Sequence, residues 1–440
     1  MKKRLSILVA FLMVFTSMLG ATGKSFANNT KLDLTAKYAV LMDYETGEVL
    51  YGKNRNEKLY PASTTKVWTA HVVLKHVPDL SQVIEIKDLP PIDGSSMYLR
   101  NGESFTVRDL LNALLVHSSN DAAYVLATYV SGSKSEFVKL MNEEAKAIGA
   151  KNTHFNNPHG LPDKEHYTTA YDMALMAREA MSDEVFRNIV KTKTLTFEAT
   201  EAYPYARIFK NTNKFLSSNE KIKYKGEEIN IQYDIVDGIK TGYTDDAGRC
   251  LLSSGVKNNM RLISAVFKTN GNNLYLDSRT LLDYGFENYY TTTIVEKEKF
   301  TNSKKVLLSK QGELVYEPEY SYKTILPNGT KPKDYTTNIK LDKIDLPIHK
   351  GDKVGVLEVS NGDKLEHTIN LVAKDNVNSI FGIITENKAI MSAVKLALAG
   401  LGALVIFILL IILRKKSKKR KKYNSSIYSN KTKHPKKRRR

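Results

Sequence analysis

Three short motifs follow one another in a fixed order along this chain of 440 residues, and they limit the folds that it can adopt. They are Ser63-Thr64-Thr65-Lys66, then Ser118-Ser119-Asn120, then Lys240-Thr241-Gly242. Each motif alone carries little weight, because S-x-x-K occurs by chance in many chains. Together they supply a nucleophile, a base, a second proton relay and a cationic anchor, which make a complete site for acyl transfer. The fold therefore has to bring a helix start, a break between helices and a strand into one place.

The first motif pairs a serine with a lysine. Ser63 and Lys66 are three residues apart at a predicted helix start, so they share one face, and the free N–H groups and the helix dipole favour negative charge near Ser63. Lys66 can take the serine proton only when it is neutral, which requires a pKa well below the ordinary value of about 10.4. We expect burial and the cation of Lys240 to lower it. Taken alone, the motif also fits a capped helix whose lysine faces water.

The second motif falls in a break between two predicted helices. The Ser118 hydroxyl can relay a proton to a leaving amine, and the Asn120 amide can hold a catalytic side chain and the substrate backbone. Asn120 or Asp121 could instead cap the following helix, and capping does not exclude catalysis.

The third motif lies on a predicted strand. Lys240 and Thr241 offer a positive charge and a hydroxyl, both suited to a terminal carboxylate. Gly242 has no side chain, so an extended peptide could lie along this strand if the strand is at an edge of its sheet. A plain strand end followed by a turn is the alternative.

The order of predicted elements indicates the fold class. Strand-like runs lie at both ends of the first 290 residues: two around a turn in residues 37–52 and three in residues 234–270. Helices are predicted between and after them, from Ser63 onward and at 107–116, 121–130, 135–149, 168–192 and 274–285, with Thr106 as one cap. We therefore expect an α+β fold in which an antiparallel sheet draws strands from both ends and is covered by helices.

The sequence pattern divides the chain into further segments besides the one that carries the three motifs. Residues 28–290 are predicted to form the main domain and residues 291–380 a small β-rich domain, followed by a linker at 381–395. Residues 396–413 are eighteen residues without a charge, long enough to span a membrane, and a basic tail follows at 414–440. Residues 1–27 have the basic start, apolar run and small-residue site of a signal peptide, with cleavage expected after Ala27.

The distribution of charge argues against nucleic acid as a partner. The formal net charge is +19, but residues 1–27 hold four Lys or Arg without an acid and residues 414–440 hold fifteen. These two segments account for the whole excess, so the body of the protein is neutral. Basic residues directly after the span place the tail in the cytoplasm, beside anionic lipid, and the domains outside the cell membrane.

The single cysteine and a group of histidines bear on two other kinds of site. Cys250 is the single cysteine and lies in a strand-like run, so a packed core thiol is expected. His154, His159 and His166 lie close together in sequence, but in a loop with no recognised ligand spacing and without an H-E-x-x-H motif, so no metal site is expected.

With these motifs in place, the chain resembles the serine-type D-alanyl-D-alanine carboxypeptidases, the low-molecular-mass penicillin-binding proteins of peptidase family S11. The three motifs together are the signature of serine β-lactamases and penicillin-binding proteins. The resemblance extends to YPASTTK around Ser63, HSSNDAA around Ser118, NPHGL at 157–161 and DGIKTGYTDDAGRC around Lys240. It also covers the β-rich region and the C-terminal membrane attachment, although many relatives attach by an amphipathic helix.

The resemblance implies a role for each motif residue and departs from the family at none of them. Ser63 would be the acylated nucleophile and Lys66 its base, while Ser118 and Asn120 would assist proton transfer and hold the substrate. The residues expected to bind substrate are Lys240, Thr241, Gly242 and Tyr243, and backbone N–H groups of Ser63 and Tyr243 would form the oxyanion hole. The implied substrate is the peptidoglycan pentapeptide, the implied inhibitors are β-lactams, and no cofactor is expected.

Two alternatives stay open from the sequence. A β-lactamase shares the motifs, but class A enzymes need a glutamate for deacylation; Glu165 is present, whereas Thr169 stands where an asparagine is expected. The second alternative is a non-catalytic wall-binding scaffold on a decayed enzyme fold. It predicts the loss of a motif residue, and every motif residue is present.

Overall fold

A computed structural model describes residues 31–380 and 388–429. The chain divides into two compact units. The first contains the residues up to Ile294 together with Lys323–Pro332, and the second contains Val295–Tyr322 and the residues from Lys333 onward. Residues 323–332 thus belong with the first unit, although the sequence predicted one β-rich domain over 291–380. The predicted signal peptide, its cleavage after Ala27 and the end of the basic tail lie outside the described residues.

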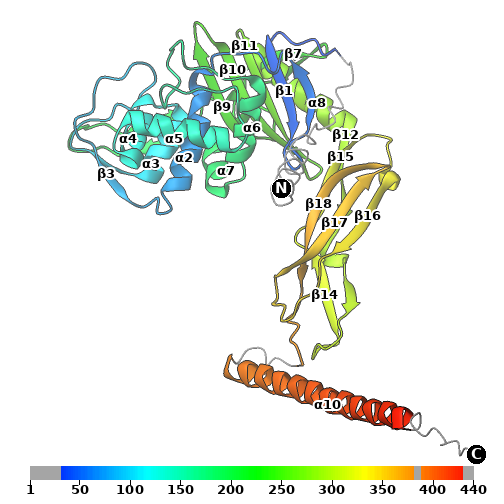
Figure 1. The fold of residues 1–440 in the computed structure, drawn as a ribbon. Coiled ribbons are helices and arrows are strands. Elements are labelled where there is room, and N and C mark those ends of the chain that lie inside the picture. Colours follow the sequence, from blue (N-terminus) through cyan, green and yellow to red (C-terminus); the bar gives the residue numbers. More distant parts are fainter. Residues whose placement is uncertain (1–30, 381–387, 430–440) are drawn as a thin grey trace, which may run out of the picture. The chain divides into compact units, whose positions relative to one another are not determined.

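The first unit is built on a five-stranded antiparallel sheet with the order β2-β1-β11-β10-β9 (Figure 1). Strands from the two ends of the unit are paired, since Val40 lies opposite Ala265. The predicted α+β fold with an antiparallel sheet is therefore confirmed. The strands are β1 (Tyr38–Asp43), β2 (Val49–Lys53), β9 (Val236–Thr244), β10 (Gly248–Lys257) and β11 (Met260–Thr269).

Strand β1 explains why the sheet sits in the middle of the unit. All six of its residues are buried, as its nearly continuous apolar sequence YAVLMD requires. Because side chains alternate along a strand, Val40 and Met42 join one core with the helices of the middle of the chain. Ala39 and Leu41 join a second core with α8 (Asn273–Asn288). The two faces of the sheet are thus covered by different helices.

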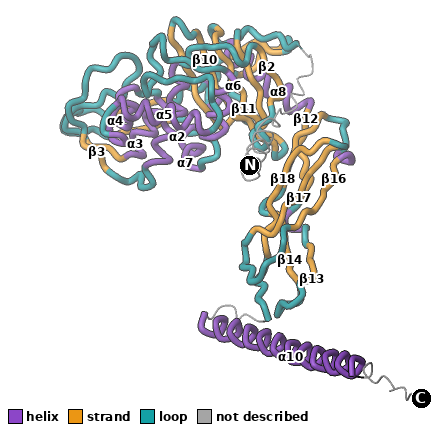
Figure 2. Tube along the Cα trace, viewed as in Figure 1, coloured by secondary structure: helices purple, strands orange, loops and turns teal. Residues whose placement is uncertain are grey.

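The middle of the chain supplies the helical layer (Figure 2). The segment predicted as one helix over 168–192 forms two, because residues 181–183 leave the helix and Asp183 caps the second by accepting from the Phe186 N–H at 2.9 Å. The helices of this layer are α2 (Thr65–His76), α3 (Val107–Asn112), α4 (Asn120–Ser131), α5 (Lys134–Ala147), α6 (Ala170–Ala180) and α7 (Glu184–Val190).

Short strands and turns complete the unit. They form four two-stranded sheets, which pair β3 with β4, β5 with β6, β7 with β8, and β12 with β15. These strands are β3 (Val83–Glu85), β4 (Ser104–Thr106), β5 (Thr194–Phe197), β6 (Arg207–Lys210), β7 (Lys221–Tyr224), β8 (Glu227–Asn230), β12 (Tyr289–Val295) and β15 (Tyr322–Pro327).

The second unit holds another antiparallel sheet, with the order β13-β14-β18-β17-β16. A turn at residues 361–364 joins β17 to β18, since Asn361 pairs with Lys364. Alternate residues of these strands are buried, which is typical of a sheet with one covered face. The strands are β13 (Asn302–Lys305), β14 (Glu313–Pro318), β16 (Tyr335–Leu341), β17 (Lys353–Asn361) and β18 (Lys364–Ala373).

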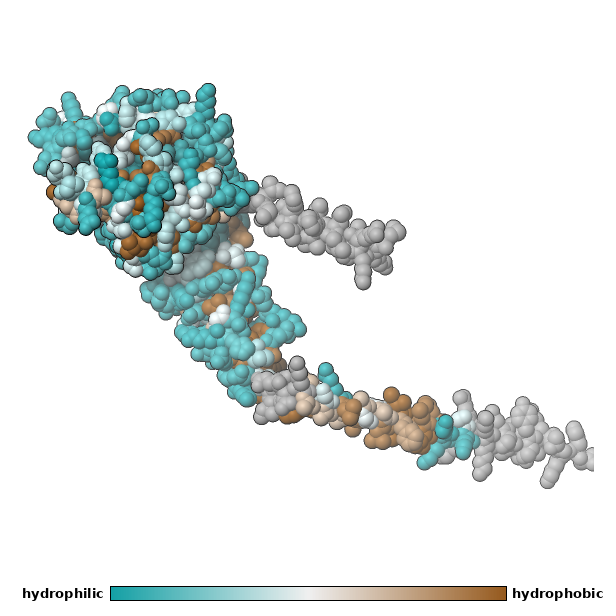
Figure 3. All heavy atoms as spheres, turned by 90° about the vertical axis from the view of Figure 1, so that its left-hand side faces the viewer, coloured by the Kyte–Doolittle hydropathy of each residue, from teal (hydrophilic) through white to brown (hydrophobic). Residues whose placement is uncertain are grey.

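The last described element is the long helix α10 (Lys388–Ser429). Residues 388–395, predicted as part of a linker, are already helical. Within α10, Ala389–Lys418 is long and apolar enough to cross a membrane, with a mean hydropathy of 3.1 in its most apolar window and none of that window buried. Figure 3 shows this apolar surface along the helix. The helix fits a membrane anchor, as the sequence predicted.

Candidate active site

Ser63 lies in a 3-10 turn, η1 (Ala62–Thr64), that leads directly into α2. Pro61 precedes the turn, and its carbonyl accepts hydrogen bonds from the Thr64 N–H at 3.3 Å and the Thr64 hydroxyl at 2.7 Å. A proline at this position has its φ angle already set for a helix start and removes a donor that would lack a partner. Ser63 is therefore held at the N-terminus of a helix, where free N–H groups can face a ligand.

Lys66 is fully buried and reaches back to the serine. Its Nζ lies 2.9 Å from Ser63 Oγ and 2.7 Å from the carbonyl oxygen of His159. When the amine is neutral, it can donate an N–H to the carbonyl and turn its lone pair toward the Ser63 hydroxyl. The structure thus brings the two predicted residues of the first motif within hydrogen-bond distance of each other. Proton transfer between them requires such a distance.

The surroundings of Lys66 favour the neutral amine. Burial lowers the pKa of Lys66 well below its usual value, and the nearby cation of Lys240 lowers it further, while Asp121 acts in the opposite direction. Both causes expected from the sequence are present. The alternative of a lysine facing water is excluded, because the Lys66 side chain has no exposed surface.

The loop at 157–161 packs on α2 and provides the carbonyl that Lys66 contacts. The Asn157 side chain shapes the loop, since its Oδ1 accepts from the Gly160 N–H at 2.7 Å and its Nδ2 donates to the Leu161 carbonyl at 3.0 Å. The Pro158 carbonyl accepts from the Thr69 hydroxyl at 2.6 Å. These hydrogen bonds fix the shape of the N-P-H-G-L segment and hold it against α2 beside Lys66.

Gly160 is required by close packing as well as by backbone conformation. Its φ angle is +86°, and a Cβ atom placed there would lie 1.9 Å from the carbonyl oxygen of Ala62. No side chain fits at that distance from backbone, so the glycine lets the loop lie directly against the turn that carries Ser63.

The second motif starts at an irregularity in the helical layer. After α3 the chain forms a π-helical turn, η2 (Ala113–His117), and Ser118 then takes a left-handed conformation with φ +71° before α4 begins at Asn120. Thr106 caps α3 as predicted, with a full capping box to Asp109. Neither Asn120 nor Asp121 caps α4, so that predicted alternative is wrong. π-Helical turns of this kind are common at functional sites.

Asn120 is buried and only half satisfied. Its Nδ2 donates to the Asp93 carbonyl at 2.6 Å and its N–H to the Ser95 carbonyl at 2.7 Å. Its Oδ1 is buried and has no hydrogen-bond partner among the described residues. A Cβ atom on Gly94 would lie 2.7 Å from Asn120 Nδ2 and 3.7 Å from Leu161, so the second motif meets the 157–161 loop. The orphan carbonyl oxygen is available to a donor from substrate or another side chain.

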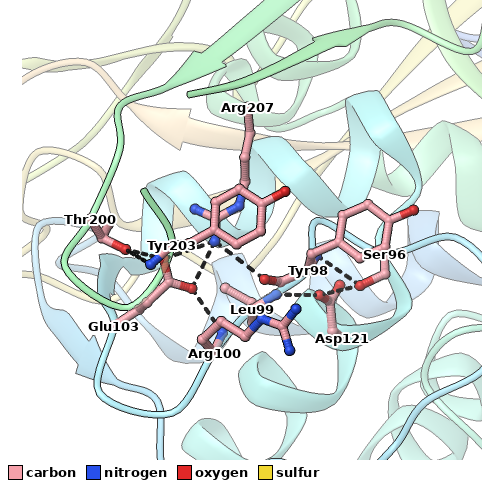
Figure 4. A network of polar contacts seen from close by, with 9 residues as sticks. All are labelled: Ser96, Tyr98, Leu99, Arg100, Glu103, Asp121, Thr200, Tyr203 and Arg207. Atoms are coloured by element: carbon pink, nitrogen blue, oxygen red, sulfur yellow. Dashed lines mark hydrogen bonds and ion pairs between the residues drawn. The ribbon is translucent and has the colours of Figure 1, made fainter. Parts of the chain in front are cut away.

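Asp121 organises the loop of residues 96–99 (Figure 4). The carboxylate is buried and accepts from the Ser96 hydroxyl at 2.6 Å and from the N–H groups of Met97 and Leu99 at 3.2 and 3.0 Å. Three donors satisfy the buried charge and fix the backbone of residues 96–99. Asp121 therefore stabilises the loop that packs beside the second motif.

A buried ion pair clamps the same loop at its other end (Figure 4). Arg207 Nη2 lies 2.8 Å from Glu103 Oε1 and Oε2, and both side chains are buried. Glu103 also accepts from the Arg100 N–H at 2.8 Å and the Thr200 hydroxyl at 2.5 Å, and the guanidinium lies over the ring of Tyr203 at 4.0 Å. The pair thus ties residues 200–207 to the loop beside the second motif.

Removing one partner of this pair should be costly. We expect Arg207→Met to lower the free energy of unfolding by on the order of 3 kcal/mol, because it leaves the Glu103 carboxylate buried without its cation. Thermal or denaturant unfolding measures the effect. The double variant Glu103→Gln with Arg207→Met should recover part of the loss, since no unpaired charge remains. Equal stability of the single variant and the parent would contradict this account.

The third motif lies on β9, which is an edge strand of the central sheet. Thr241 Oγ1 donates to Thr212 Oγ1 at 2.7 Å, and the Thr212 N–H donates to the carbonyl of Val116 at 3.2 Å. Thr212 therefore connects the third motif with the turn before Ser118. Lys240 is buried and donates to the Thr241 carbonyl at 3.0 Å. Burial lowers the pKa of Lys240 to about 7.

Gly242 is the point where β9 meets the nucleophile. A Cβ atom at this position would lie 3.1 Å from Ser63 N and 3.2 Å from Pro61 O, so a side chain would press on the turn that carries the serine. The next residue, Tyr243, exposes its ring and donates its hydroxyl to Asp245 at 2.7 Å. The backbone of residues 242–243 therefore runs beside the Ser63 N–H, as an oxyanion site requires.

The histidines and the cysteine have separate roles. His166 Nε2 lies 2.9 Å from the Thr65 hydroxyl, and His154 Nδ1 lies 2.6 Å from the Glu165 carbonyl. Within residues 31–380 and 388–429, no group of three or more His, Cys, Asp or Glu side chains is placed to hold a metal ion. Cys250 is buried in the core, and burial raises the pKa of its thiol to about 12.

Several contributors to the site were not found from the sequence. Thr212, the His159 carbonyl, Asp121 and the Glu103–Arg207 pair are tertiary contacts between segments far apart in the chain. Asp121 had no distinguishing local signal, because an acidic residue in the first turn of a helix is common and favourable. A backbone carbonyl carries no signal in sequence at all.

Comparison with known proteins adds evidence of relationship. The family model described as D-alanyl-D-alanine carboxypeptidase matches residues 24–271, and the one described as Penicillin-binding protein 5, C-terminal domain, matches residues 289–379. The D-alanyl-D-alanine carboxypeptidase DacF of Bacillus subtilis is 34% identical over 402 residues, which is 89% of this chain and 98% of DacF. DacD of Escherichia coli is 30% identical over 381 residues, 83% of this chain and 92% of DacD.

Solved structures give the same result. Penicillin binding protein 5 from Haemophilus influenzae superposes with a TM-score of 0.62 at 30% identity, covering 80% of this chain and 99% of that protein. The D-alanyl-D-alanine carboxypeptidase DacD from Francisella tularensis gives a TM-score of 0.58 at 28% identity, covering 82% of this chain and 98% of that protein. The likeness extends over both units of the fold.

Proposed function

This chain belongs to the D-alanyl-D-alanine carboxypeptidase family of penicillin-binding proteins and is a serine-type carboxypeptidase, and on that premise we propose that Ser63 is its nucleophile. The substrate is the pentapeptide side chain of peptidoglycan, which loses its terminal D-alanine. The observation that carries the assignment is the 2.9 Å contact between Ser63 Oγ and the buried Lys66 Nζ. β-Lactams are expected to acylate the same oxygen.

Acylation follows from the groups around Ser63. Neutral Lys66 takes the hydroxyl proton while Ser63 Oγ attacks the carbonyl carbon of the penultimate D-alanine. The oxyanion faces the backbone N–H groups of Ser63 and Tyr243, and such donors contribute on the order of 10²–10³ in rate. The C–N bond then breaks. Ser118 gives its hydroxyl proton to the nitrogen of the leaving D-alanine and takes the proton of Lys66 in its place, which returns Lys66 to the neutral amine.

Deacylation uses the same groups in reverse order. Water gives a proton to Lys66 and attacks the ester carbonyl, and the C–O bond to Ser63 breaks, which releases the tetrapeptide and restores the hydroxyl. Asn120, with its unpartnered carbonyl oxygen, holds the substrate backbone or Lys66 through this cycle. No cofactor enters either step.

Substrate binding is assigned to the edge strand β9. An extended peptide can add to this edge by backbone hydrogen bonds. Gly242 lets the strand lie directly against the turn that carries Ser63, so a peptide on this edge would lie beside the nucleophile. Lys240 and Thr241 are proposed to bind the terminal carboxylate. This places the scissile bond between the carboxylate anchor and the oxyanion donors.

The direct test is release of D-alanine from a peptide ending in D-alanyl-D-alanine. The purified full-length protein should release it, and a benzylpenicillin pretreatment should stop the release. Failure to release D-alanine, with penicillin still bound, would contradict carboxypeptidase activity. Neither alternative from the sequence is favoured: the matched families are carboxypeptidases, and Glu165 is exposed to solvent instead of lying in the site.

The pH dependence should report the two buried lysines. On the acid side, kcat/KM should fall as Lys66, whose pKa lies below its usual value, becomes protonated. On the alkaline side, kcat/KM should fall as Lys240 loses its proton above its pKa of about 7. Lys240→Arg keeps its charge at high pH, so the alkaline fall should disappear or move up by more than one pH unit, whatever the absolute rate. An unchanged alkaline limb in Lys240→Arg would remove Lys240 from carboxylate binding.

The localisation proposed for the chain rests on its two ends. Residues 1–27 direct export and are removed after Ala27, α10 crosses the cell membrane, and the basic tail from residue 414 stays in the cytoplasm. The first unit and the β-sheet of the second unit then lie outside the membrane, where peptidoglycan is found. The domain boundaries 28–290 and 291–380 are part of the same proposal.

A further inference from the structure

Three exposed aliphatic side chains meet at one end of the second unit. The exposed fractions of Leu307, Leu308 and Ile380 are 89%, 59% and 48%. Single exposed leucines are ordinary on protein surfaces. These three are neighbours, however, because the Ile380 N–H donates to the Leu308 carbonyl at 2.8 Å. We call them the apolar tip.

The backbone of the apolar tip is held in place by hydrogen bonds. Ser309 donates its hydroxyl to the Val306 carbonyl at 2.8 Å and accepts from the Gly312 N–H at 2.9 Å. The Lys310 N–H donates to the Asn378 carbonyl at 2.8 Å. The turn between β13 and β14 is therefore built to a definite shape, and the exposure of its two leucines is not the result of a loose loop.

The same turn contains a strained residue. Leu308 has a φ angle of +64°, which is unfavourable for a residue with a bulky side chain. Because more than half of Leu308 is exposed, packing within the unit offsets little of this strain. Strain of this kind is maintained where a surface serves a purpose outside the fold.

The position of the apolar tip in the chain indicates what covers it. Ile380 is eight residues before Lys388, where α10 begins, and an extended chain of eight residues spans at most about 29 Å. The helix segment that is long and apolar enough to cross a membrane, Ala389–Lys418, begins at the next residue. Whatever the orientation of the second unit, the tip therefore stays within about 29 Å of the start of the membrane helix.

The charges beside the tip fit a lipid surface. Lys304, Lys305 and Lys310 lie in or next to the same turn and are exposed. In the described part of the chain none of the three forms an ion pair with a carboxylate. Aliphatic side chains flanked by unpaired lysines are the composition of segments that enter the interface of an anionic bilayer.

We propose that the apolar tip is a membrane-contact surface, in which Leu307, Leu308 and Ile380 enter the headgroup region of the bilayer that α10 crosses. The flanking lysines contact anionic headgroups. The second unit is then bound to the membrane at two places, through α10 and through the tip, which limits how far the unit can tilt. This inference depends on α10 being in a membrane and is independent of the residues assigned to catalysis.

The test uses tryptophan fluorescence of the full-length protein in vesicles of phosphatidylcholine and phosphatidylglycerol that carry bromine on their acyl chains. The chain has one tryptophan, Trp68, which is buried in the first unit and gives a constant background. Leu307→Trp places a reporter on the tip. Leu365→Trp is the matched control, because Leu365 is also exposed, at 50%, but lies near the opposite end of β18 from the residues that lead to the tip.

The result expected is that brominated lipid quenches the added fluorescence of Leu307→Trp at least about two-fold more than that of Leu365→Trp, with a blue-shifted emission. Leu308→Asp introduced into Leu307→Trp should reduce the quenching, since a carboxylate opposes entry into an anionic interface. Penicillin labelling of each variant verifies that the first unit is folded. Equal quenching at positions 307 and 365 would overturn the proposal and leave the tip to a protein partner.

Discussion

Ser63→Ala is expected to abolish both D-alanine release and covalent labelling by penicillin, with kcat reduced by on the order of 10⁴-fold or more. The variant removes one oxygen, the atom that lies 2.9 Å from Lys66 Nζ and that the mechanism requires as nucleophile. The binding groups on β9 and the helix N-terminus remain. Substrate should therefore still bind, so the loss should appear in kcat much more than in KM.

Ser119→Ala is the matched control for this variant. Ser119 lies between Ser118 and Asn120, is fully buried, and its hydroxyl has no partner among the described residues. Losing that hydroxyl should leave labelling and turnover within a few-fold of the parent. A Ser63→Ala protein that still forms a stable penicillin adduct would show that another residue is the nucleophile.

Lys66→Gln is expected to give the second largest effect, a loss of about 10²–10⁴-fold in the acylation rate, which is the usual contribution of a general base. Glutamine can still contact the His159 carbonyl, but it cannot accept the Ser63 proton. The rate of fluorescent penicillin labelling measures this step directly. The remaining slow labelling should also lose the acid limb of the pH profile, because that limb is assigned to Lys66.

Lys75→Gln provides the control on the same helix. Lys75 lies on the solvent side of α2 and pairs with Glu144, so its removal changes charge without touching the site. It should leave the labelling rate and its pH profile unchanged. A Lys66→Gln protein that labels at the parental rate would exclude Lys66 as the base.

The sequence predicted most of the chemistry of the three motifs, because this chemistry depends on residues that lie close together within each motif. Three residues on a helix fix the Ser63–Lys66 relation, and strand runs at both ends of the first unit allow only a sheet that joins them. The contacts that complete the site come from tertiary structure. The His159 carbonyl that holds Lys66 could belong to any residue, and Thr212 reaches Thr241 only after the chain has folded.

Other differences have identifiable causes. The helix predicted over 168–192 breaks before Asp183, whose capping signal was present but hidden in an otherwise helical pattern. Asn120 looked like a cap, but its side chain is turned to the Asp93 carbonyl because α4 begins inside the protein and not at its surface. The Glu103–Arg207 pair joins positions 104 residues apart, and no local pattern indicates such a contact.

The most direct test of the central claim is to find which residue penicillin acylates. The full-length protein is treated with penicillin, digested with trypsin and analysed by mass spectrometry. The adduct should lie on the peptide that ends at Lys66, should map to Ser63, and should persist for minutes. An adduct on another peptide, or one that clears within seconds as the drug is consumed, would contradict the assignment of Ser63 as the nucleophile of a penicillin-binding carboxypeptidase.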